Sequence, residues 1–377
     1  MILALAFSVT GCGGGSDAEG VNVEGDTIKI GVFEPTTGEN GGGGMQEVLG
    51  IRYANQLNPT VEVGGKTYNI ELVEVDNQSD KTAAVTAAQQ LISDGVVGVL
   101  GSYGSGVAIA AGDTFKTAAV PAIGCSCTNP QVTSDNEFYF RVCFLDPFQG
   151  TVMASFASNE LKVKRAAIYI DNTSDYAKGL AQFFKENFVK NGGQVVIEEA
   201  YLQKDTDFKS TLTKIKAAQP DFIYIPGYYQ EVGLIVKQAR EMGITVPMAG
   251  GDGWDSAKLP EIAGKAALEN TFFSSLYSPD DTSDLNKEFV AEYKKAYNTN
   301  PDVFAALAYD STLLVAKAIE DAGSADPAKI AEAMANIKGF KGVSGEVTFN
   351  EEHNPIKSAV IIEHKDGKQT FKTKVNP

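Results

Sequence analysis

The chain has 377 residues, of which 43% are hydrophobic, and a formal net charge of −16 from 48 acidic and 32 basic side chains. This length is sufficient for two domains, each with a hydrophobic core of its own. A surface this acidic repels phosphate backbones and anionic lipid, so we expect no nucleic-acid partner.

The N-terminal segment differs from the rest of the chain. An apolar run over residues 2–9 is followed by Thr10, Gly11 and Cys12 and then by a spacer rich in glycine and acidic residues. The run is too short to span a bilayer as a helix. The segment resembles the end of a bacterial lipoprotein signal, although no Lys or Arg precedes the apolar run. We therefore expect residues 1–25 to be a signal and flexible spacer, with lipidation at Cys12 and export of the protein.

Strands and helices alternate in the next part of the chain. Apolar runs rich in β-branched residues predict strands, and apolar residues at helical spacing predict helices. The predicted strands are 27–35, 68–77, 96–102 and 120–124, and the predicted helices are 45–58, 80–95 and 106–118. Parallel strands need crossover helices, so this alternation predicts a parallel sheet covered on both faces.

The same pattern begins again after residue 146, which predicts a second sheet of the same design. Its predicted strands are 165–171, 194–201, 221–227 and 246–251, and its predicted helices are 177–192, 207–218 and 230–243. A strand at 272–277, a long apolar helix at 304–323 and a β-rich tail at 345–350 and 358–371 complete the chain. The predicted fold class is α/β with two doubly wound lobes, and the tail is expected to form a hairpin or to return to a sheet edge.

Residues suited to catalysis or metal binding are few. His353 and His364 lie in contexts typical of a turn and an exposed strand, so neither is expected to serve as a catalytic base. Cys125, Cys127 and Cys143 fall short of the four ligands that a structural zinc site needs. We expect no catalytic residue, no metal and no cofactor.

The cysteines leave two alternatives open. Cys125 and Cys143 stand at the ends of neighbouring predicted strands, so an exported protein could join them in a disulfide. Free buried cysteines that act as small apolar side chains are the alternative that we favour. A cysteine nucleophile is the enzyme hypothesis, and thiol alkylation that leaves ligand binding intact would exclude it.

The glycine run from Gly38 to Gly44 lies between the first predicted strand and its helix, where phosphate-binding loops also lie. It lacks the Gly-Lys-Ser/Thr ending of such loops, so we do not expect a nucleotide there. The glycines offer backbone N–H groups near a helix start and space that side chains would otherwise fill.

Polar and aromatic segments follow five of the predicted strands, at residues 101–106, 124–130, 171–179, 227–231 and 251–255. In open α/β sheets, ligands bind at the carboxyl ends of the strands. Because the five segments are divided between two sheets, they predict a binding cleft between two lobes.

At this point the chain resembles the bacterial periplasmic binding proteins for leucine, isoleucine and valine, the substrate-binding subunits of branched-chain amino acid ABC transporters. The resemblance runs from Thr27 onward. It rests on GVFEPTTGENGG, EVLGIRYANQLN, GSYGS, TNPQVT, FRVCFLDPFQG, YAKGLA, DFIYIPGYYQEVGLIVKQAREMG, GDGW and ALAYDS, in this order. It implies the type 1 periplasmic binding protein fold, in which two lobes joined by three crossings close on a ligand. The implied first lobe comprises residues 26–146 and about 276–350, and the second comprises 147–275 and about 351–377.

The resemblance also implies residues that bind the charged groups of the ligand. Ser105 and Thr128 match hydroxyls that hold the ligand carboxylate, and backbone groups of Ser126 and Thr128, with Cys127 between them, flank the second hydroxyl. Asp252 matches the acid placed against the ligand ammonium, with an ordinary turn residue as its alternative. Hydroxyls and helix N-termini suit a carboxylate, and an acid suits an ammonium.

Aromatic residues are implied around the ligand side chain. Tyr176 and Tyr228 match aromatic positions of the family, and Tyr103 and Trp254 are further candidates for which core packing is the alternative. Phe304 is a weaker candidate. An aromatic residue of leucine-binding relatives falls opposite Gly43, so the identity of the ligand does not transfer.

The function expected from the sequence is therefore capture of an amino acid, neutral or aliphatic, and its delivery to an ABC permease. We expect a monomeric protein that catalyses no reaction and is held by its lipid anchor in the periplasm or at the outer face of the cell membrane. The alternatives are the same fold binding an amide, a urea-like compound or an aromatic acid, or a ligand-binding protein that serves a sensory receptor.

Overall fold

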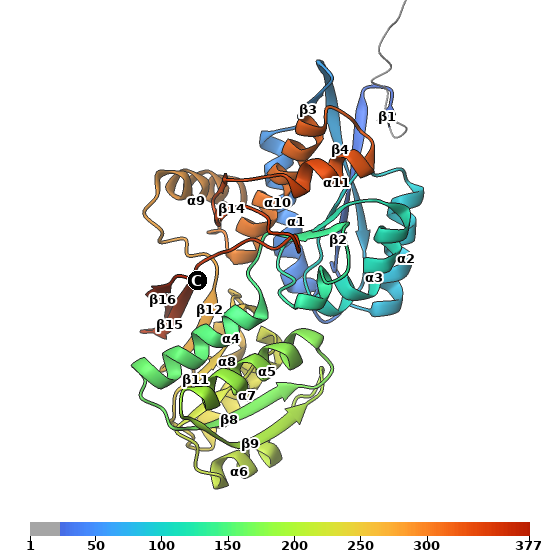
Figure 1. The fold of residues 1–377 in the computed structure, drawn as a ribbon. Helices are drawn as coiled ribbons and strands as arrows, with labels where there is room; N and C mark the ends of the chain where they lie inside the picture. The colour runs from blue at the N-terminus through green and yellow to red at the C-terminus, as the bar shows by residue number, and fades with distance from the viewer. Residues whose placement is uncertain (1–22) are drawn as a thin grey trace, which may run out of the picture.

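The computed structural model describes residues 23–377 as two α/β lobes, one above the other in Figure 1, with the chain crossing between them. The predicted lipidation site, Cys12, lies outside the described residues. No helix within residues 23–377 is long and apolar enough to cross a membrane.

The sheet of the first lobe contains seven strands within the described residues, in the order β3-β4-β2-β5-β6-β7, with β1 paired to β2. The strands β4, β2, β5, β6 and β7 are parallel, and β1 and β3 run antiparallel to their neighbours. The bounds are β1 (Val23–Glu24), β2 (Thr27–Glu34), β3 (Thr60–Val63), β4 (Lys66–Asp76), β5 (Val99–Leu100), β6 (Ala122–Gly124) and β7 (Tyr139–Arg141).

Helices cover both faces of this sheet (Figure 1). On one face α1 packs along α10, which also contacts α11, and on the other face α2 packs along α3. The bounds are α1 (Gly41–Leu57), α2 (Lys81–Ser93), α3 (Ser105–Ala118), α9 (Asp284–Tyr297), α10 (Val303–Ala322) and α11 (Pro327–Ala335), with a short helix η1 (Pro130–Val132). A small hairpin, β13 (Phe340–Gly342) and β14 (Gly345–Val347), follows α11.

The sheet of the second lobe also contains seven strands within residues 23–377, in the order β16-β15-β12-β11-β10-β8-β9. Strands β8 to β12 are parallel, and the hairpin β15–β16 is added antiparallel beside β12. The bounds are β8 (Arg165–Asp171), β9 (Gln194–Tyr201), β10 (Phe222–Tyr224), β11 (Met248–Gly250), β12 (Thr271–Ser275), β15 (Ala359–Lys365) and β16 (Lys368–Val375). The β-rich tail was predicted to form a hairpin or to return to a sheet edge, and it does both.

The helices of the second lobe also lie on both faces of its sheet. On one face α4 packs along α5, and on the other face α7 packs along α8. The bounds are α4 (Asp146–Ser155), α5 (Asp175–Lys190), α6 (Lys209–Ala217), α7 (Tyr229–Glu241) and α8 (Leu259–Ala263), with η2 (Phe156–Glu160) and η3 (Asp252–Trp254) as short helices. Every residue of the central strands β10, β11 and β12 is buried, as a sheet covered on both faces requires.

The glycine run differs from its prediction as a loop. Helix α1 begins at Gly41, so Gly41–Gly44 form its first turn. A Cβ atom on Gly43 would lie 2.3 Å from the ring of Tyr103, and one on Gly42 would lie 2.1 Å from the hydroxyl of Tyr229. Glycine is therefore used here because two tyrosines approach the helix backbone closely.

His364 was predicted on an exposed strand, and this prediction is wrong. Its side chain in β15 is 2% exposed, and Nδ1 lies 3.0 Å from the hydroxyl of Thr271. Burial lowers the pKa of His364 to about 4. His353 is partly buried and stacks on Phe140, with 4.1 Å between the ring centres. Both imidazoles therefore have packing roles in the C-terminal segment.

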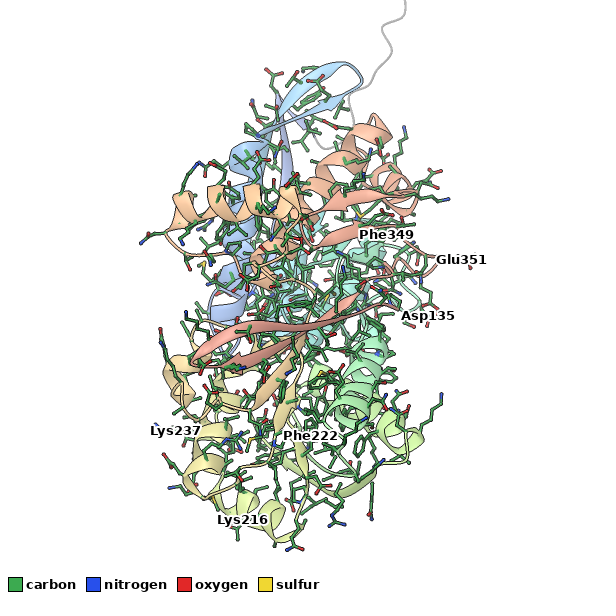
Figure 2. All side chains as sticks on the ribbon, turned by 90° about the vertical axis from the view of Figure 1, so that its left-hand side faces the viewer. Asp135, Lys216, Phe222, Lys237, Phe349 and Glu351 are labelled. Atoms are coloured by element: carbon green, nitrogen blue, oxygen red, sulfur yellow. The ribbon has the colours of Figure 1, made fainter. Side chains whose placement is uncertain are left out.

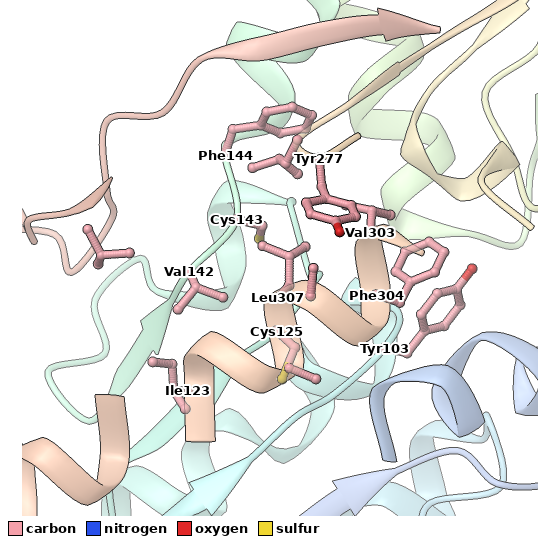
Figure 3. Packing of buried hydrophobic residues seen from close by; sticks show 14 of the residues in the cluster. Tyr103, Ile123, Cys125, Val142, Cys143, Phe144, Tyr277, Val303, Phe304 and Leu307 are labelled. Carbon is pink, nitrogen blue, oxygen red and sulfur yellow. The ribbon is translucent and has the colours of Figure 1, made fainter. Parts of the chain in front are cut away.

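The cysteines of the described chain are free and buried, as the favoured interpretation expected. Cys125 and Cys143 point among the apolar side chains of the first lobe (Figure 3). The thiol of Cys143 donates to the backbone carbonyl of Cys127 over 3.4 Å. Burial raises the pKa of Cys127 to about 12, so this thiol is protonated at neutral pH. These cysteines act as small packing residues.

Three segments connect the lobes: residues 142–145, 276–283 and 348–358. The third lies against the first lobe, where Thr133 donates to Asn354 over 3.0 Å, and Figure 2 shows Phe349 and Glu351 near Asp135. In the same view Phe222 lies in the second lobe.

The third segment is fixed near its end by the buried Lys357, whose Nζ donates to the Ser344 hydroxyl over 2.8 Å. Desolvation lowers the pKa of Lys357 to about 8.

Candidate functional site

A small cavity lies between the lobes. Its volume is about 10 Å³, which is room for about one water molecule. The residues that line it form two groups, which we call the first-lobe wall and the second-lobe wall. The first-lobe wall consists of Tyr103, Gly104, Ser105, Ser126 and Phe304. The second-lobe wall consists of Tyr176, Tyr228, Asp252 and Gly253.

Three helices direct their N-termini toward this cavity. Ser105 is the first residue of α3, Tyr176 is the second residue of α5, and Tyr228 directly precedes α7. The first N–H groups of a helix have no partner within the helix, and the helix dipole makes this end positive. The cavity is therefore prepared for an anionic group.

The first-lobe wall presents neutral hydroxyls. Ser105 Oγ accepts a hydrogen bond from the backbone N–H of Asn129 over 3.2 Å, which leaves its own proton free for another acceptor. The hydroxyl of Ser126 donates to Glu47, which lies behind the wall. This side of the cavity thus offers donors and no exposed carboxylate.

Thr128 and Cys127 stand just behind Ser126 rather than among the residues that line the cavity. Thr128 Oγ1 lies near the Asp146 carboxyl, and it makes no hydrogen bond of ordinary geometry within residues 23–377. The carbonyl of Cys127 accepts from Nη1 of Arg141 over 2.7 Å. The loop 125–129 is therefore supported from below by a fully buried guanidinium.

The second-lobe wall presents one acid, Asp252. Its Oδ1 accepts from Nε2 of Gln149 over 2.9 Å and from the hydroxyl of Tyr176 over 2.8 Å. Gln149 Oε1 in turn accepts from the backbone N–H of Asp252 over 3.0 Å and from the hydroxyl of Ser274 over 2.9 Å. Burial raises the pKa of Asp252 to about 6, and these donors oppose the rise. Asp252 is therefore predominantly ionised at neutral pH.

Aromatic rings form a continuous row across the cavity. The ring centres of Phe304 and Tyr103 are 4.8 Å apart, those of Tyr103 and Tyr228 are 5.4 Å apart, and those of Tyr228 and Tyr176 are 5.3 Å apart. Figure 3 shows Phe304 and Tyr103 side by side at the first-lobe end of the row. The row gives the cavity an apolar side next to its polar ends.

The lobes are held together beside the cavity by polar contacts. Lys81 of the first lobe pairs with Asp175 of the second at 2.5 Å, and Asn129 Nδ2 donates to the carbonyl of Asp175 over 2.9 Å. Lys204 pairs with Glu39 across the other side at 3.0 Å. The structure therefore shows the two lobes in a closed arrangement.

Seven of the ten candidate residues named from the sequence line the cavity: Tyr103, Ser105, Ser126, Tyr176, Tyr228, Asp252 and the weaker candidate Phe304. The structure places Trp254 elsewhere. Its indole is fully buried in the core of the second lobe, and Nε1 donates to the carbonyl of Ile225 over 3.0 Å. Core packing, the alternative given for Trp254, describes this position.

Sequence reasoning did not single out Gln149, Arg141 or the pair Glu34 and Glu47, which hold the wall residues in place. Gln149 and Arg141 stand within the motif FRVCFLDPFQG, and Glu47 opens the motif EVLGIRYANQLN. A polar residue among the apolar residues of these motifs was the signal in the sequence that could have identified these supporting side chains.

The family described as periplasmic binding protein matches residues 27–369 of the chain. The chain belongs to this family. The resemblance and the two-lobe fold predicted from the sequence are thereby confirmed.

Relatives of this periplasmic binding protein agree with the assignment. The chain is 32% identical over 330 residues to the leucine-, isoleucine-, valine-, threonine- and alanine-binding protein of Pseudomonas aeruginosa, covering 86% of each chain. The crystal structure of the leucine-binding protein LivK of Thermotoga maritima matches with a TM-score of 0.89 and 38% identity, over 93% of this chain and 99% of the other. The structure of LivJ of Streptococcus pneumoniae in complex with isoleucine matches with a TM-score of 0.87 and 36% identity, over 93% of this chain and all of the other.

Proposed function

We propose that this periplasmic binding protein captures a neutral, aliphatic amino acid between its lobes and delivers it to an ABC permease. One observation carries the proposal: the acid Asp252 of the second-lobe wall faces the neutral hydroxyls and the α3 N-terminus of the first-lobe wall across one small cavity. This arrangement suits a zwitterion, because each charged end must exchange its water for hydrogen bonds when it is buried.

The first-lobe wall would hold the ligand carboxylate. Ser105 has a hydroxyl proton to donate, and the N-terminus of α3 adds backbone N–H groups and a favourable dipole. Thr128 Oγ1, which lacks a hydrogen bond of ordinary geometry within the described chain, would supply the second hydroxyl, and backbone groups of Ser126 and Thr128, with Cys127 between them, would flank it. The buried Arg141 behind this loop contributes positive potential without touching the ligand.

The second-lobe wall would hold the ligand ammonium. Gln149 and Tyr176 both donate to Oδ1 of Asp252, so we assign its other oxygen, Oδ2, to the ammonium. The row of Phe304, Tyr103, Tyr228 and Tyr176 would lie against the ligand side chain, which favours an apolar one.

Binding would be coupled to closure of the lobes. A cavity of about 10 Å³ cannot admit an amino acid, so the ligand must enter while the lobes are apart. Closing then forms the contacts of Lys81 and Asn129 with Asp175. The closed form would be the one that the permease recognises. We assign residues 26–146 and about 276–350 to one moving lobe and 147–275 and about 351–377 to the other.

The relatives support the ligand class. The Pseudomonas protein is named for leucine, isoleucine, valine, threonine and alanine, and the Streptococcus structure contains isoleucine. We extend their location outside the cytoplasm to this chain, and we keep Cys12 as the proposed lipid anchor and the monomer as the proposed state.

A thermal-shift screen of the purified protein against the common amino acids tests this proposal, because a ligand that binds only the folded state raises the melting temperature. We expect the largest shifts with leucine, isoleucine or valine, followed by calorimetric titration of those that respond. Small amides, urea-like compounds and aromatic acids belong in the same screen. A response to one of these classes alone, with silence from every amino acid, would refute the proposed ligand class.

A further inference from the structure

Two buried acids lie directly behind the first-lobe wall. Glu34 ends strand β2 and is 1% exposed, and Glu47 lies in helix α1 and is fully buried. Oxygen atoms of the two carboxyl groups and Sγ of Cys125 all lie within 4.8 Å of one another. Within residues 23–377 neither acid forms an ion pair, so no basic side chain balances them. Their position needs a physical explanation, because two adjacent buried carboxylates repel each other.

Each acid holds one residue of the cavity wall. Glu34 Oε2 accepts a hydrogen bond from the backbone N–H of Tyr103 over 2.7 Å. Glu47 Oε1 accepts from the hydroxyl of Ser126. Tyr103 and Ser126 belong to the two loops that carry the first-lobe wall. The adjacent carboxyl groups of Glu34 and Glu47 therefore hold both loops in place, one through Tyr103 and the other through Ser126.

The remaining oxygen of each acid is buried without a donor. Glu34 Oε1 and Glu47 Oε2 make no hydrogen bond with ordinary donors in the described part of the chain. An ionised carboxylate is an acceptor only, so two ionised groups would leave both oxygens unpaired. A proton on one acid turns it into a donor toward the other, which removes the repulsion and satisfies both groups at once.

The surroundings indicate which acid carries the proton. Burial, and after it the neighbouring charge of Glu47, raise the pKa of Glu34 well above its usual range. Burial raises the pKa of Glu47 to about 7, and the nearby Glu34 carboxyl, Ser126 hydroxyl and Cys125 thiol oppose the rise. The other titratable groups that act on the pair from neighbouring elements are Tyr103, Cys125, Cys127, Tyr139, Cys143, Asp252 and Asp302. Above neutral pH, Glu34 is therefore the acid and Glu47 is the carboxylate.

We propose that Glu34 is a protonated positioning residue, whose hydroxyl donates to Glu47 so that the pair holds Tyr103 and Ser126 in the geometry that binds the ligand. This inference rests on the proposed function, since the wall that it orders is the proposed carboxylate site. It also means that the first lobe holds two acids behind its wall while presenting donors to the cavity.

The decisive variants separate a hydrogen-bond donor from a charge. In Glu34→Gln the amide Nε2 can donate to Glu47 while Oε1 accepts from Tyr103, so we expect affinity for L-leucine and L-isoleucine to stay within about threefold of wild type. Glu34→Ala removes both contacts and leaves Glu47 unpaired, so we expect binding at least about tenfold weaker. Glu47→Gln places an amide donor among the donors of Ser126 and Glu34, so we expect weaker binding than in Glu34→Gln. Glu71→Gln, at an exposed position of β4, is the control and should leave affinity unchanged.

A second readout needs no ligand. The infrared spectrum of wild type should contain the C=O stretch of a protonated carboxyl group that is lost in Glu34→Gln. Because the pKa of Glu34 is raised in the folded state, this group stabilises the protein below its unfolded pKa, and the contribution is lost as pH rises. Between pH 7 and pH 9 we therefore expect the folding equilibrium constant to fall less steeply in Glu34→Gln than in wild type. The difference between the two slopes should reach up to about tenfold per pH unit, the effect of one proton.

The outcomes separate this inference from the proposed function. Failure of wild type to bind any amino acid, with the infrared difference present, would refute the function and retain the protonated pair. Equal affinities of Glu34→Gln and Glu34→Ala, or an unchanged carboxyl band in Glu34→Gln, would overturn the inference. Stoichiometric metal in the purified protein that disappears in Glu34→Gln would overturn it as well, because a cation would then bridge the two acids in place of the proton.

Discussion

Each wall of the cavity combines acids with hydrogen-bond donors, but the first-lobe wall places its donors toward the cavity and the second-lobe wall places its acid there. In the first-lobe wall, hydroxyl and backbone groups face the cavity while Glu34 and Glu47 lie behind it. In the second-lobe wall, the acid Asp252 faces the cavity and its donor Gln149 lies behind. The overall charge of −16 is thus a poor guide to the site. What a ligand meets is decided by which atoms each lobe turns inward.

The largest effect should come from removing the one acid that faces the cavity. We expect Asp252→Asn to weaken amino-acid binding by about 2–5 kcal/mol, because a buried ammonium loses its partner. Isothermal titration calorimetry measures the change. Asp255→Asn is the matched control: Asp255 is buried three residues away, and burial raises its pKa to about 8, so replacing it by a neutral amide should alter affinity little. Undiminished affinity in Asp252→Asn would contradict the assignment of the ligand ammonium to the second-lobe wall.

The next effect should come from the opposite wall. Ser105→Ala removes the hydroxyl assigned to the ligand carboxylate, and we expect a loss of about 1.5–3 kcal/mol, typical of a hydrogen bond to a charged group. The same titration checks it. Ser311→Ala removes a buried hydroxyl of α10 that donates to the Leu307 carbonyl over 2.9 Å, away from the cavity lining. Equal losses in the two serine variants would argue against a specific role for Ser105.

A fall in pH below 7 should act most directly on the second-lobe wall, where Asp252 would contact the ligand ammonium. The pKa of Asp252 is raised to about 6, and the ammonium needs the ionised carboxylate, so affinity should be constant above this value and fall below it. At pH 5 we expect binding about tenfold weaker than at pH 7.5. Titration at both pH values measures this, and the dependence should be smaller in Asp252→Asn, where Glu47, with a pKa raised to about 7, still titrates behind the first-lobe wall. Stronger binding at pH 5 would contradict an ionised Asp252 in the wild-type complex.

The smallest effect on affinity should come from Trp254→Phe. The indole lies in the core and not in either wall, so we expect unchanged ligand affinity within experimental error. The Ile225 carbonyl loses its donor, and we expect the free energy of unfolding to fall by about 1–3 kcal/mol. Chemical denaturation and ligand titration on the same preparation separate the two quantities. A clear loss of affinity in a fully folded variant would place Trp254 in the second-lobe wall after all.

The alternation of strands and helices could be predicted because buried parallel strands and their crossover helices leave strong local patterns. The same alternation placed the segments 101–106, 124–130 and 251–255 at the carboxyl ends of parallel strands, and the family resemblance singled out Ser105, Ser126 and Asp252 within them. The start of α1 could not be predicted. Four successive glycines have low helix propensity, and the reason for glycine appears only in the structure, where a Cβ atom would meet Tyr229 at Gly42 and Tyr103 at Gly43.

Contacts distant in sequence were beyond a local pattern. Gln149 and Asp252 are 103 residues apart, and their hydrogen bond exists only because the two elements meet in the folded second lobe. Orientation was equally hidden: Asp252 and Trp254 share one short turn, but their side chains enter the cavity and the core respectively. The exposure of His364 was misjudged because β15 lies inside the sheet between β12 and β16, and the imidazole packs near Phe273 of β12, with 5.5 Å between the ring centres.

The pairing of β12 with β15 has a mechanical consequence. These strands lead into the second and third segments between the lobes, and they stay in antiparallel register from Thr271 and His364 to Ser275 and Val360. In a hinged closure a few residues at the ends of such elements absorb the change in backbone angles, so the paired strands should move as one body. When the lobes part, the second and third segments should therefore move from one common pair of strands, which returns Asp252 to the same place opposite Ser105 after every cycle.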